Sequence, residues 1–348
     1  MEITMLMSEA NFLKSTRSLL ERGRQMGDQK TIGVLTSGGD APGMNAAIRA
    51  IVRTGIHYGF KMIGIRKGYN GLISGDFVEM TPRSVSDMLQ RGGTILQTAR
   101  SEAFKTEAGI QKAVKMAKSK GIDGIVVIGG DGSFKGARAL SHKGISTVGI
   151  PGTIDNDIDC TEYTIGFDTA LNTIKDAIDK LRDTATSHER CSVVEVMGKD
   201  AGYIAVNVGI ASGAEAIIVP EREFDFQKDI FEPIMQGKKR GKKHDIVILA
   251  EGVGDAVKLA RKIEAETGIE ARATILGHLQ RGGSPTAMDR VIASQMGAKA
   301  IEILKAGKSN RVVAMNQNKI VDFDIDEALA MEKSIDNEML ALSKILST

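Results

Sequence analysis

The sequence predicts an α/β protein with mostly parallel sheets, divided into two lobes. Short apolar runs of strand length alternate with helical patterns along almost the whole chain, the order typical of βαβ units. The 348 residues are enough to build two compact lobes. Neither a low-complexity segment nor a repeat nor a proline-rich linker interrupts the pattern, so composition alone gives no sharp boundary between the lobes.

The predicted strands are short apolar runs. In chain order they are Thr31–Leu35, Lys61–Ile65, Gly124–Ile128, Ser146–Ile150, Ser192–Val196, Ala216–Val219, Asp245–Leu249 and Val312–Met315. A helix is expected directly after the first strand, at Ala46–Arg53. The clearest helix is Thr169–Asp183, whose apolar residues recur at helical spacing.

Composition excludes several classes of protein. A hydrophobic content of 42% and a charged content of 26% are those of an ordinary soluble globular protein. The formal charge of +2, with dispersed basic residues, gives no reason to expect nucleic acid as a partner. No apolar run is long enough to span a membrane. Two cysteines, Cys160 and Cys191, are more typical of a reduced cytoplasmic protein than of a disulfide scaffold. Neither lies in a nucleophile motif, which argues against thiol catalysis.

Residues 1–29 differ from the rest of the chain. They mix charged and scattered apolar residues and lack the continuous apolar core of a secretory signal. Leu13, Leu19 and Leu20 could form one side of a short helix. We therefore expect an N-terminal extension that is a solvated or loosely docked helix without a targeting role.

Polar residues follow the strand Ser146–Ile150. The segment Pro151–Asp157 contains two carboxylates, a hydroxyl and a glycine, and open α/β sheets bind ligands at the carboxyl ends of their strands. One of Asp155 and Asp157 could accept a proton while the other faces a cation. Taken alone, the segment is equally typical of a polar turn.

Two further predicted strands end in similar loops. Gly129–Ser133 precedes a helical pattern, where glycines and a helix N-terminus suit a phosphate, and Asp131 could hold Mg²⁺. Thr36–Asn45 follows the first strand. Neither loop is a Walker A or a GxGxxG sequence, and each alone is as typical of an ordinary turn. Three such loops in one half of the chain indicate a phosphate site.

From about Lys30 to the C-terminus the chain resembles the bacterial ATP-dependent 6-phosphofructokinases. The resemblance rests on TSGGDAPGMNAAIR, VVIGGDGSFKGA, PGTIDNDI, TATSHER, VVEVMGK and LGHLQRGGSPTAMDR, in the family's order and spacing. The GGDG element alone also occurs in NAD kinases and lipid kinases. The resemblance implies the phosphofructokinase fold, with two three-layer αβα lobes. Its large ATP-binding lobe would comprise residues 30–166 and 281–327, and its small sugar-phosphate lobe residues 167–280 and 328–348.

The resemblance also implies a reaction and its residues. ATP would phosphorylate the 1-hydroxyl of fructose 6-phosphate, with Asp155 as proton acceptor, Thr153 orienting the transferred group and Asp157 assisting through the metal or the sugar. Asp131 would be the Mg²⁺ ligand, and Tyr69 would lie on the adenosine side. The ATP-binding positions are Gly39, Arg100, Ser101, Gly130, Asp131, Gly132 and Ser133.

The substrate side departs from the family pattern at one residue. Lys199 stands where many members have arginine, so the charge is kept and the planar fork is lost. Arg190 and Arg272 resemble arginines that reach the sugar 6-phosphate from a neighbouring subunit of a homotetramer. The remaining substrate positions are Thr153, Asp155, Met197, Gly198, Glu251, His278 and Arg281.

Two glycines favour ATP over pyrophosphate as the donor. In the similar pyrophosphate-dependent enzymes, Gly132 would be aspartate and Gly152 would be lysine, which would crowd the α-phosphate region of ATP and neutralise pyrophosphate. The alternatives are the pyrophosphate-dependent reaction, another phosphorylated ketose as acceptor, and a catalytically silent sugar-phosphate or nucleotide sensor.

The resemblance implies an effector pocket for ADP or phosphoenolpyruvate. Most of its residues are basic, as an anionic effector requires, and Pro82 falls where the pattern commonly has arginine. We therefore expect a pocket with altered affinity. Its residues would be Arg49, Arg53, Arg182, Gly213, Glu215, Arg240, Lys242 and His244.

Overall fold

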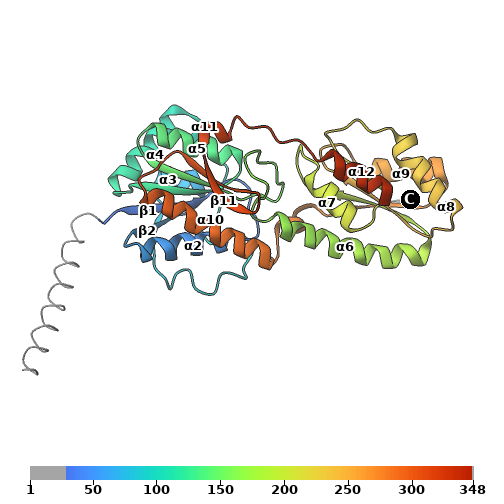
Figure 1. Ribbon diagram of the computed structural model, residues 1–348, viewed down its shortest axis with the longest axis horizontal. Helices are drawn as coiled ribbons and strands as arrows, with labels where there is room; N and C mark the ends of the chain where they lie inside the picture. The colour runs from blue at the N-terminus through green and yellow to red at the C-terminus, as the bar shows by residue number, and fades with distance from the viewer. Residues whose placement is uncertain (1–28, 347–348) are drawn as a thin grey trace, which may run out of the picture.

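The computed structural model describes residues 29–346, which form two lobes side by side along the long axis (Figure 1). The predicted α/β class with mostly parallel sheets is confirmed. The helix expected within residues 1–29 lies outside the described residues. Among the helices of the described range, none combines the length and the apolar character needed to cross a membrane.

The large lobe is built on a sheet of seven strands within residues 29–346, in the order β11-β10-β5-β4-β1-β2-β3. Neighbouring strands are parallel except for the pairs β10–β11 and β2–β3, which add an antiparallel strand to each edge. The strands are β1 Thr31–Thr36, β2 Lys61–Ile65, β3 Phe77–Met80, β4 Gly124–Gly129, β5 Ser146–Pro151, β10 Arg311–Asn316 and β11 Lys319–Asp324.

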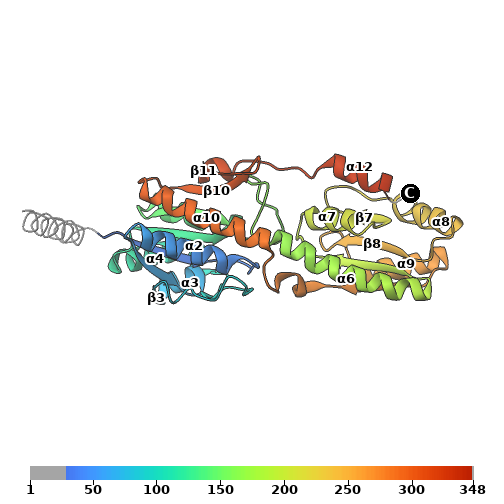
Figure 2. The ribbon, with the colours of Figure 1, turned by 60° about the horizontal axis from the view of Figure 1, so that its bottom comes forward.

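Helices cover both faces of this sheet because alternate residues of each central strand point to opposite sides. In β4, Val126 packs toward the helices α2 and α10, whereas Val127 packs toward α3, α4 and α5. Helices α2 and α10 lie side by side (Figure 2). The helices are α2 Met44–His57, α3 Gly68–Ser74, η2 Ala103–Lys105, α4 Glu107–Ser119, α5 Asp131–His142, α10 Ala287–Lys305 and α11 Ile325–Ala328.

The small lobe has a parallel sheet of four strands, counted within the same described range, in the order β7-β8-β6-β9. Helices α6, α7 and α12 cover one face and α8 and α9 the other. The strands are β6 Cys191–Val196, β7 Ala216–Ile218, β8 Asp245–Ala250 and β9 Ala271–Ile275. The helices are α6 Phe167–His188, α7 Tyr203–Ala211, η3 Gln227–Phe231, α8 Glu232–Lys239, α9 Ala256–Thr267, η4 Gly277–Arg281 and α12 Asn337–Leu346.

All eight predicted strands are present, within one or two residues of their predicted ends. The prediction missed β3, β9 and β11, which all lie at sheet edges. An edge strand is only partly buried, so its sequence need not be a continuous apolar run; β9 reads Ala-Arg-Ala-Thr-Ile. The predicted helix Thr169–Asp183 is the central part of the longer α6.

Within the described residues the chain passes between the lobes three times: after β5, through η4, and from α11 to α12. Asp289 of α10 fastens the first crossing. Its buried carboxylate accepts hydrogen bonds from the Tyr163 hydroxyl, the Gly166 N–H and Thr169. The lobe boundaries given above stay a prediction.

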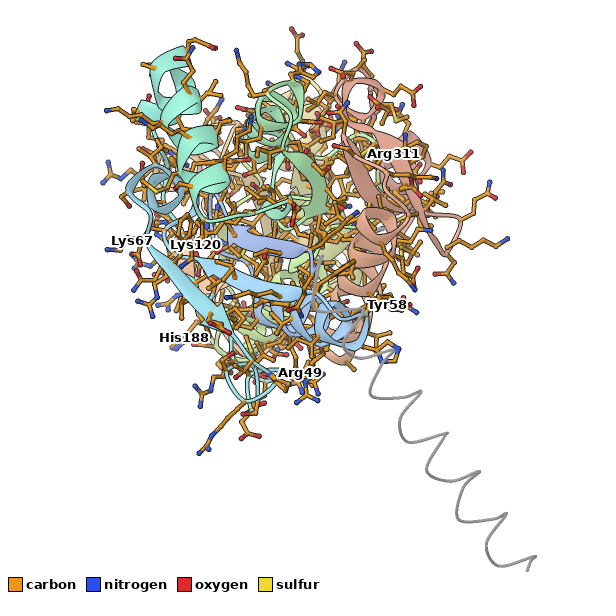
Figure 3. The ribbon with its side chains drawn as sticks, turned by 90° about the vertical axis from the view of Figure 1, so that its left-hand side faces the viewer. Arg49, Tyr58, Lys67, Lys120, His188 and Arg311 are labelled. Carbon is orange, nitrogen blue, oxygen red and sulfur yellow. The ribbon has the colours of Figure 1, made fainter. Side chains whose placement is uncertain are left out.

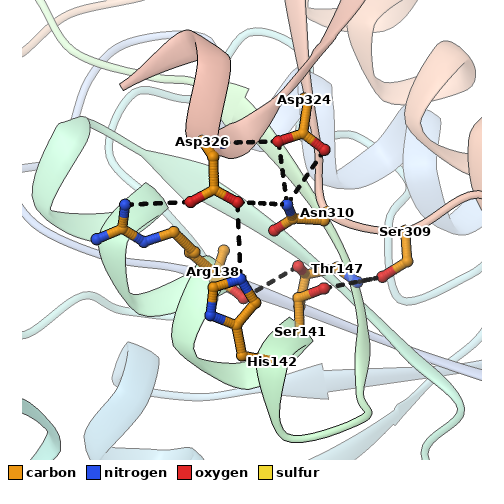
Figure 4. A network of polar contacts seen from close by, with 9 residues as sticks. Arg138, Ser141, His142, Thr147, Ser309, Asn310, Asp324 and Asp326 are labelled. Carbon is orange, nitrogen blue, oxygen red and sulfur yellow. Dashed lines mark hydrogen bonds and ion pairs between the residues drawn. The ribbon is translucent and has the colours of Figure 1, made fainter. Parts of the chain in front are cut away.

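A polar network fixes the C-terminal half of α5 to the end of the large sheet (Figure 4). Asp326 lies 3.3 Å from Arg138 and 3.6 Å from His142, and it accepts a hydrogen bond from Asn310. The hydroxyl groups of Ser141 and Ser309 lie 3.1 Å apart. These contacts hold the helix whose N-terminus faces the cavity described next.

Candidate active site

The carboxyl ends of the strands of both lobes face one cavity of about 840 Å³. It brings together nearly all of the predicted ATP, catalytic and sugar-side residues of this chain. Those that line it are Gly39, Arg100, Ser101, Gly130, Asp131, Gly132, Ser133, Thr153, Asp155, Asp157, Met197, Lys199, Glu251, His278 and Arg281.

The predicted phosphate end of the cavity is the N-terminus of α5. This helix begins at Asp131, directly after the last residues of β4, so its free N–H groups and the positive end of its dipole face the cavity. The Ser133 hydroxyl donates to the Ser37 carbonyl at 3.2 Å and ties the helix to the loop after β1. At Gly132 nothing lies within 4 Å of the place where a Cβ would stand, so the glycine leaves open space there.

An aromatic wall adjoins this end. The Tyr69 hydroxyl donates to the Ser133 carbonyl at 2.6 Å, and the rings of Tyr69 and Phe104 stack with centroids 4.0 Å apart. Arg100 and Ser101 lie just before Phe104 in the same lining. Phe104 was not predicted, because a single phenylalanine in a short helical turn carries no sequence signal for a ligand site.

The loop after β5 carries the predicted catalytic residues. The Thr153 hydroxyl donates to Oδ2 of Asp155 at 3.2 Å, and Asn156 adopts a left-handed conformation with φ 52° between the two aspartates. Oδ1 of Asp155 is buried and makes no hydrogen bond within residues 29–346. Burial and the neighbouring Asp157 raise the pKa of Asp155, while Arg281 opposes the shift. A carboxylate with a raised pKa suits a general base.

Asp131 is the first residue of α5 and lines the cavity. Burial first, and then the charges of Asp157 and Asp159, raise its pKa, so a cation between these groups would be stabilised. In the described residues no group of three His, Cys, Asp or Glu side chains converges to hold a metal alone. These donors fit Mg²⁺ that arrives with nucleotide phosphates, since Mg²⁺ keeps water and phosphate oxygens as most of its ligands.

The predicted sugar side of the cavity is formed by the loop after β6. Lys199 lies 3.7 Å from Asp157, and its N–H donates to Glu251 at 2.8 Å. Gly198, at φ 140°, does not line the cavity but sets this turn: a Cβ there would stand 2.4 Å from the Ala201 carbonyl.

The turn η4 brings His278 and Arg281 to the junction of the lobes. Buried Gln280 accepts from the Met197 N–H at 3.0 Å and so joins η4 to the end of β6. Arg281 donates to the Asp40 carbonyl at 3.2 Å, and a Cβ at Gly39 would stand only 2.5 Å from its guanidinium. Glycine at position 39 is therefore what allows the arginine to reach the cavity.

Arg190 and Arg272 lie outside this cavity. Both bind Glu270, with Arg190 at 2.6 Å, and they lower its pKa. They stand at the amino ends of β6 and β9, and the length of β6 puts Arg190 about 20 Å from Met197. Neither can reach a sugar in the cavity of its own chain.

The predicted effector residues fall into two groups. Arg49 and Arg53 are on α2 of the large lobe, where Arg49 is labelled in Figure 3. The others, Arg182, Gly213, Glu215, Arg240, Lys242 and His244, are in the small lobe, where Glu215 and Arg240 line a smaller cavity of about 140 Å³. Lys242 pairs with buried Glu215, and Arg182 donates to the Ser212 carbonyl. The predicted effector residues are therefore divided between the two lobes.

Comparisons with known proteins agree with this geometry. The family model described as phosphofructokinase matches residues 31–304. An ATP-dependent 6-phosphofructokinase of Clostridium botulinum strain Hall is 63% identical over 318 residues, 91% of this chain and 99% of that protein. A protein of the same name from Clostridium novyi is 60% identical over the same share of each chain.

Solved structures show the same fold. A phosphofructokinase from Saccharomyces cerevisiae superposes with a TM-score of 0.84 at 35% identity, covering 92% of this chain and 48% of that chain. A pyrophosphate-dependent phosphofructokinase from Marinobacter aquaeolei gives a TM-score of 0.81 at 20% identity, covering 89% of this chain and 86% of that chain, which shows the fold alone. The protein belongs to the phosphofructokinase family.

Proposed function

We propose that the protein transfers the γ-phosphoryl group of ATP to the 1-hydroxyl of fructose 6-phosphate, producing fructose 1,6-bisphosphate and ADP. The observation that carries the proposal is the convergence of the α5 N-terminus, Asp155 and the sugar-side loop on one cavity. Its relatives named ATP-dependent 6-phosphofructokinase support the substrates. Both cysteines are buried free thiols, which supports a reducing compartment such as the cytoplasm.

In this proposal each residue has a part in an in-line displacement. The phosphates of ATP lie against the N-terminus of α5, and its adenine ring lies toward Tyr69 and Phe104. Asp155, which lines the cavity, accepts the proton of the 1-hydroxyl. Arg281 neutralises charge beside the transferred group, and Thr153 orients it.

Asp131 would hold Mg²⁺, with Asp157 close by. When bound, the ion neutralises charge on the phosphate oxygens. We predict that Asp131→Asn raises the Mg²⁺ concentration needed for half-maximal activity by about 10-fold or more, because a neutral amide is a weaker ligand. A magnesium titration at fixed ATP measures this. The control is Asp179→Asn, on the outer side of α6, with an unchanged titration curve; an unchanged curve for Asp131→Asn would contradict the assignment.

The direct test measures fructose 1,6-bisphosphate formed from fructose 6-phosphate and Mg²⁺, with ATP or pyrophosphate in parallel. Product with ATP alone supports the proposal, and product with pyrophosphate overturns the assignment of the donor. Absence of product in a protein that still binds ATP would indicate a sensor or another phosphorylated ketose as acceptor. Other ketoses are worth testing because the exposed Lys199 lacks the planar, bidentate guanidinium group that arginine would provide at this position.

We also propose that Arg190 and Arg272 bind the 6-phosphate in the active site of a neighbouring subunit of a homotetramer. Guanidinium groups suit bidentate phosphate binding, and the distance from their own cavity excludes that site. The same assembly would join Arg49 and Arg53 to the small-lobe residues in a pocket for ADP or phosphoenolpyruvate.

Mixing two inactive variants tests the shared site. We predict that the double variant Arg190→Ala, Arg272→Ala and the single variant Asp155→Asn are each nearly inactive at low fructose 6-phosphate. Co-expressed in equal amounts, they should regain about one active site in four, because random pairing unites the intact halves. Activity equal to the sum of the separate variants would show that each site belongs to one chain.

A further inference from the structure

Lys333 lies in the last crossing between the lobes, the segment 329–336 that joins α11 to α12. Its ammonium group is directed back into the large lobe. Nζ donates to the Asn156 carbonyl at 3.0 Å and to the Thr161 carbonyl at 3.1 Å. Lys333, although distant in sequence, thus stabilises the turn between Asp155 and Asp157 through hydrogen bonds.

Asn156 is the central residue of that turn. It is buried and has φ 52°, a left-handed conformation that is uncommon for residues with a Cβ, although asparagine adopts it more often than most. Its side-chain amide donates to the Glu162 carbonyl at 3.3 Å, but Oδ1 has no hydrogen-bond partner within the described residues. The two hydrogen bonds from Lys333 to the Asn156 and Thr161 carbonyls are therefore a main support of the turn.

Lys333 is itself held by the small lobe. Its Nζ lies 4.4 Å from the ring centroid of Tyr203, the first residue of α7, and the Tyr203 hydroxyl donates to the Lys333 carbonyl at 3.3 Å. On the large-lobe side, the backbone N–H of Lys333 donates to Asp159 at 3.0 Å. Burial lowers the pKa of Lys333, while the charges of Asp159 and Asp157 oppose the shift.

We infer that Lys333 is a positioning residue for phosphoryl transfer, fixing the backbone turn that aims Asp155 and Asp157, and that Tyr203 clamps it from the small lobe. The inference rests on the function proposed above. Lys333 lines no part of the cavity, so it acts through the Asn156 backbone and not on the substrates. Because Lys333 contacts both lobes, the orientation of the general base depends on the relative position of the two lobes.

The test compares kcat and KM for Lys333→Met and Lys333→Arg in the full chain. Methionine keeps the apolar stem and removes the donors, so we expect kcat to fall about 20- to 100-fold, the cost of a misplaced reacting group. Both KM values should stay within about 3-fold, since no binding group is lost. Arginine, which keeps the donors and the contact with the ring, should recover most of the kcat.

Lys305→Met is the matched control, because Lys305 also lies over a tyrosine ring, 3.8 Å from the centroid of Tyr58, but far from the site. It should keep wild-type kcat. Wild-type kcat in Lys333→Met, or a raised KM at unchanged kcat, would overturn the inference. So would failure of arginine to rescue.

If the Lys333→Met variant does not fold, the Tyr203→Leu variant tests the inference instead. It removes the clamp and leaves the lysine, and we expect a 3- to 10-fold loss of kcat with unchanged KM, a partial misplacement; wild-type kcat overturns the inference. A wild-type protein that forms no fructose 1,6-bisphosphate would instead refute the proposed function, so the two failures are distinguishable.

Discussion

Asp155→Asn will lower kcat by about 10³-fold, within the range that general base catalysis contributes. The asparagine keeps the size of the side chain and can still accept the hydrogen bond from Thr153, so the loop should keep its shape. What is lost is the ability to take the proton of the attacking hydroxyl. A coupled assay of ADP release, with KM for both substrates, measures the effect.

The pH dependence gives a second readout of the same residue. A base works only when deprotonated, and burial and Asp157 raise the pKa of Asp155. As the pH is lowered, the kcat of the wild type should therefore begin to fall at a pH higher than the usual pKa of an aspartate. In Asp157→Asn the raising charge is gone, so the acid limb should move to lower pH. An acid limb that persists in Asp155→Asn, or residual activity near the wild type, would assign the proton to another group.

Gly132→Asp will lower kcat/KM for ATP by about 10²-fold, the effect of a negative charge placed against a bound phosphate. The structure makes this change testable because the position has open space for a Cβ, so the protein should fold. Steady-state kinetics with ATP and a thermal melt measure both points.

Gly132→Asn is the matched control for that charge. It has the same size and no charge, so its kcat/KM for ATP should lie much closer to the wild type. Equal losses for both variants would indicate crowding alone. Gly152→Lys is a less direct test, since a Cβ there would stand 2.9 Å from the side chain of Ile128, which would have to move.

Most of the fold and three of the loops that line the cavity could be predicted from local patterns, whereas the other lining residues were predicted from the family resemblance. Buried parallel strands are apolar runs, and the loops at their carboxyl ends carry the glycines and carboxylates of the site. The strands that escaped prediction lie at sheet edges, where burial on one side leaves no such run. The strands that could be predicted are therefore the buried ones.

The residues that hold the site in place could not be predicted. Lys333, Gln280 and Asp289 act through hydrogen bonds to backbone groups that lie far away in sequence. A lysine between glutamate and serine, or a glutamine in a short turn, has no spacing that marks it. Such contacts exist only once the three crossings have brought the lobes together.

Helix α6 gives the molecule a mechanical property. It runs from the first crossing between the lobes to the far end of the small lobe (Figure 1), where Arg190 follows it. Its 22 residues make a rod of about 33 Å, so a tilt of about 5° at the inner end would move the outer end by about 3 Å. The helix is thus a lever arm: a small opening angle between the lobes becomes a displacement as large as a hydrogen bond at the surface that carries Arg190.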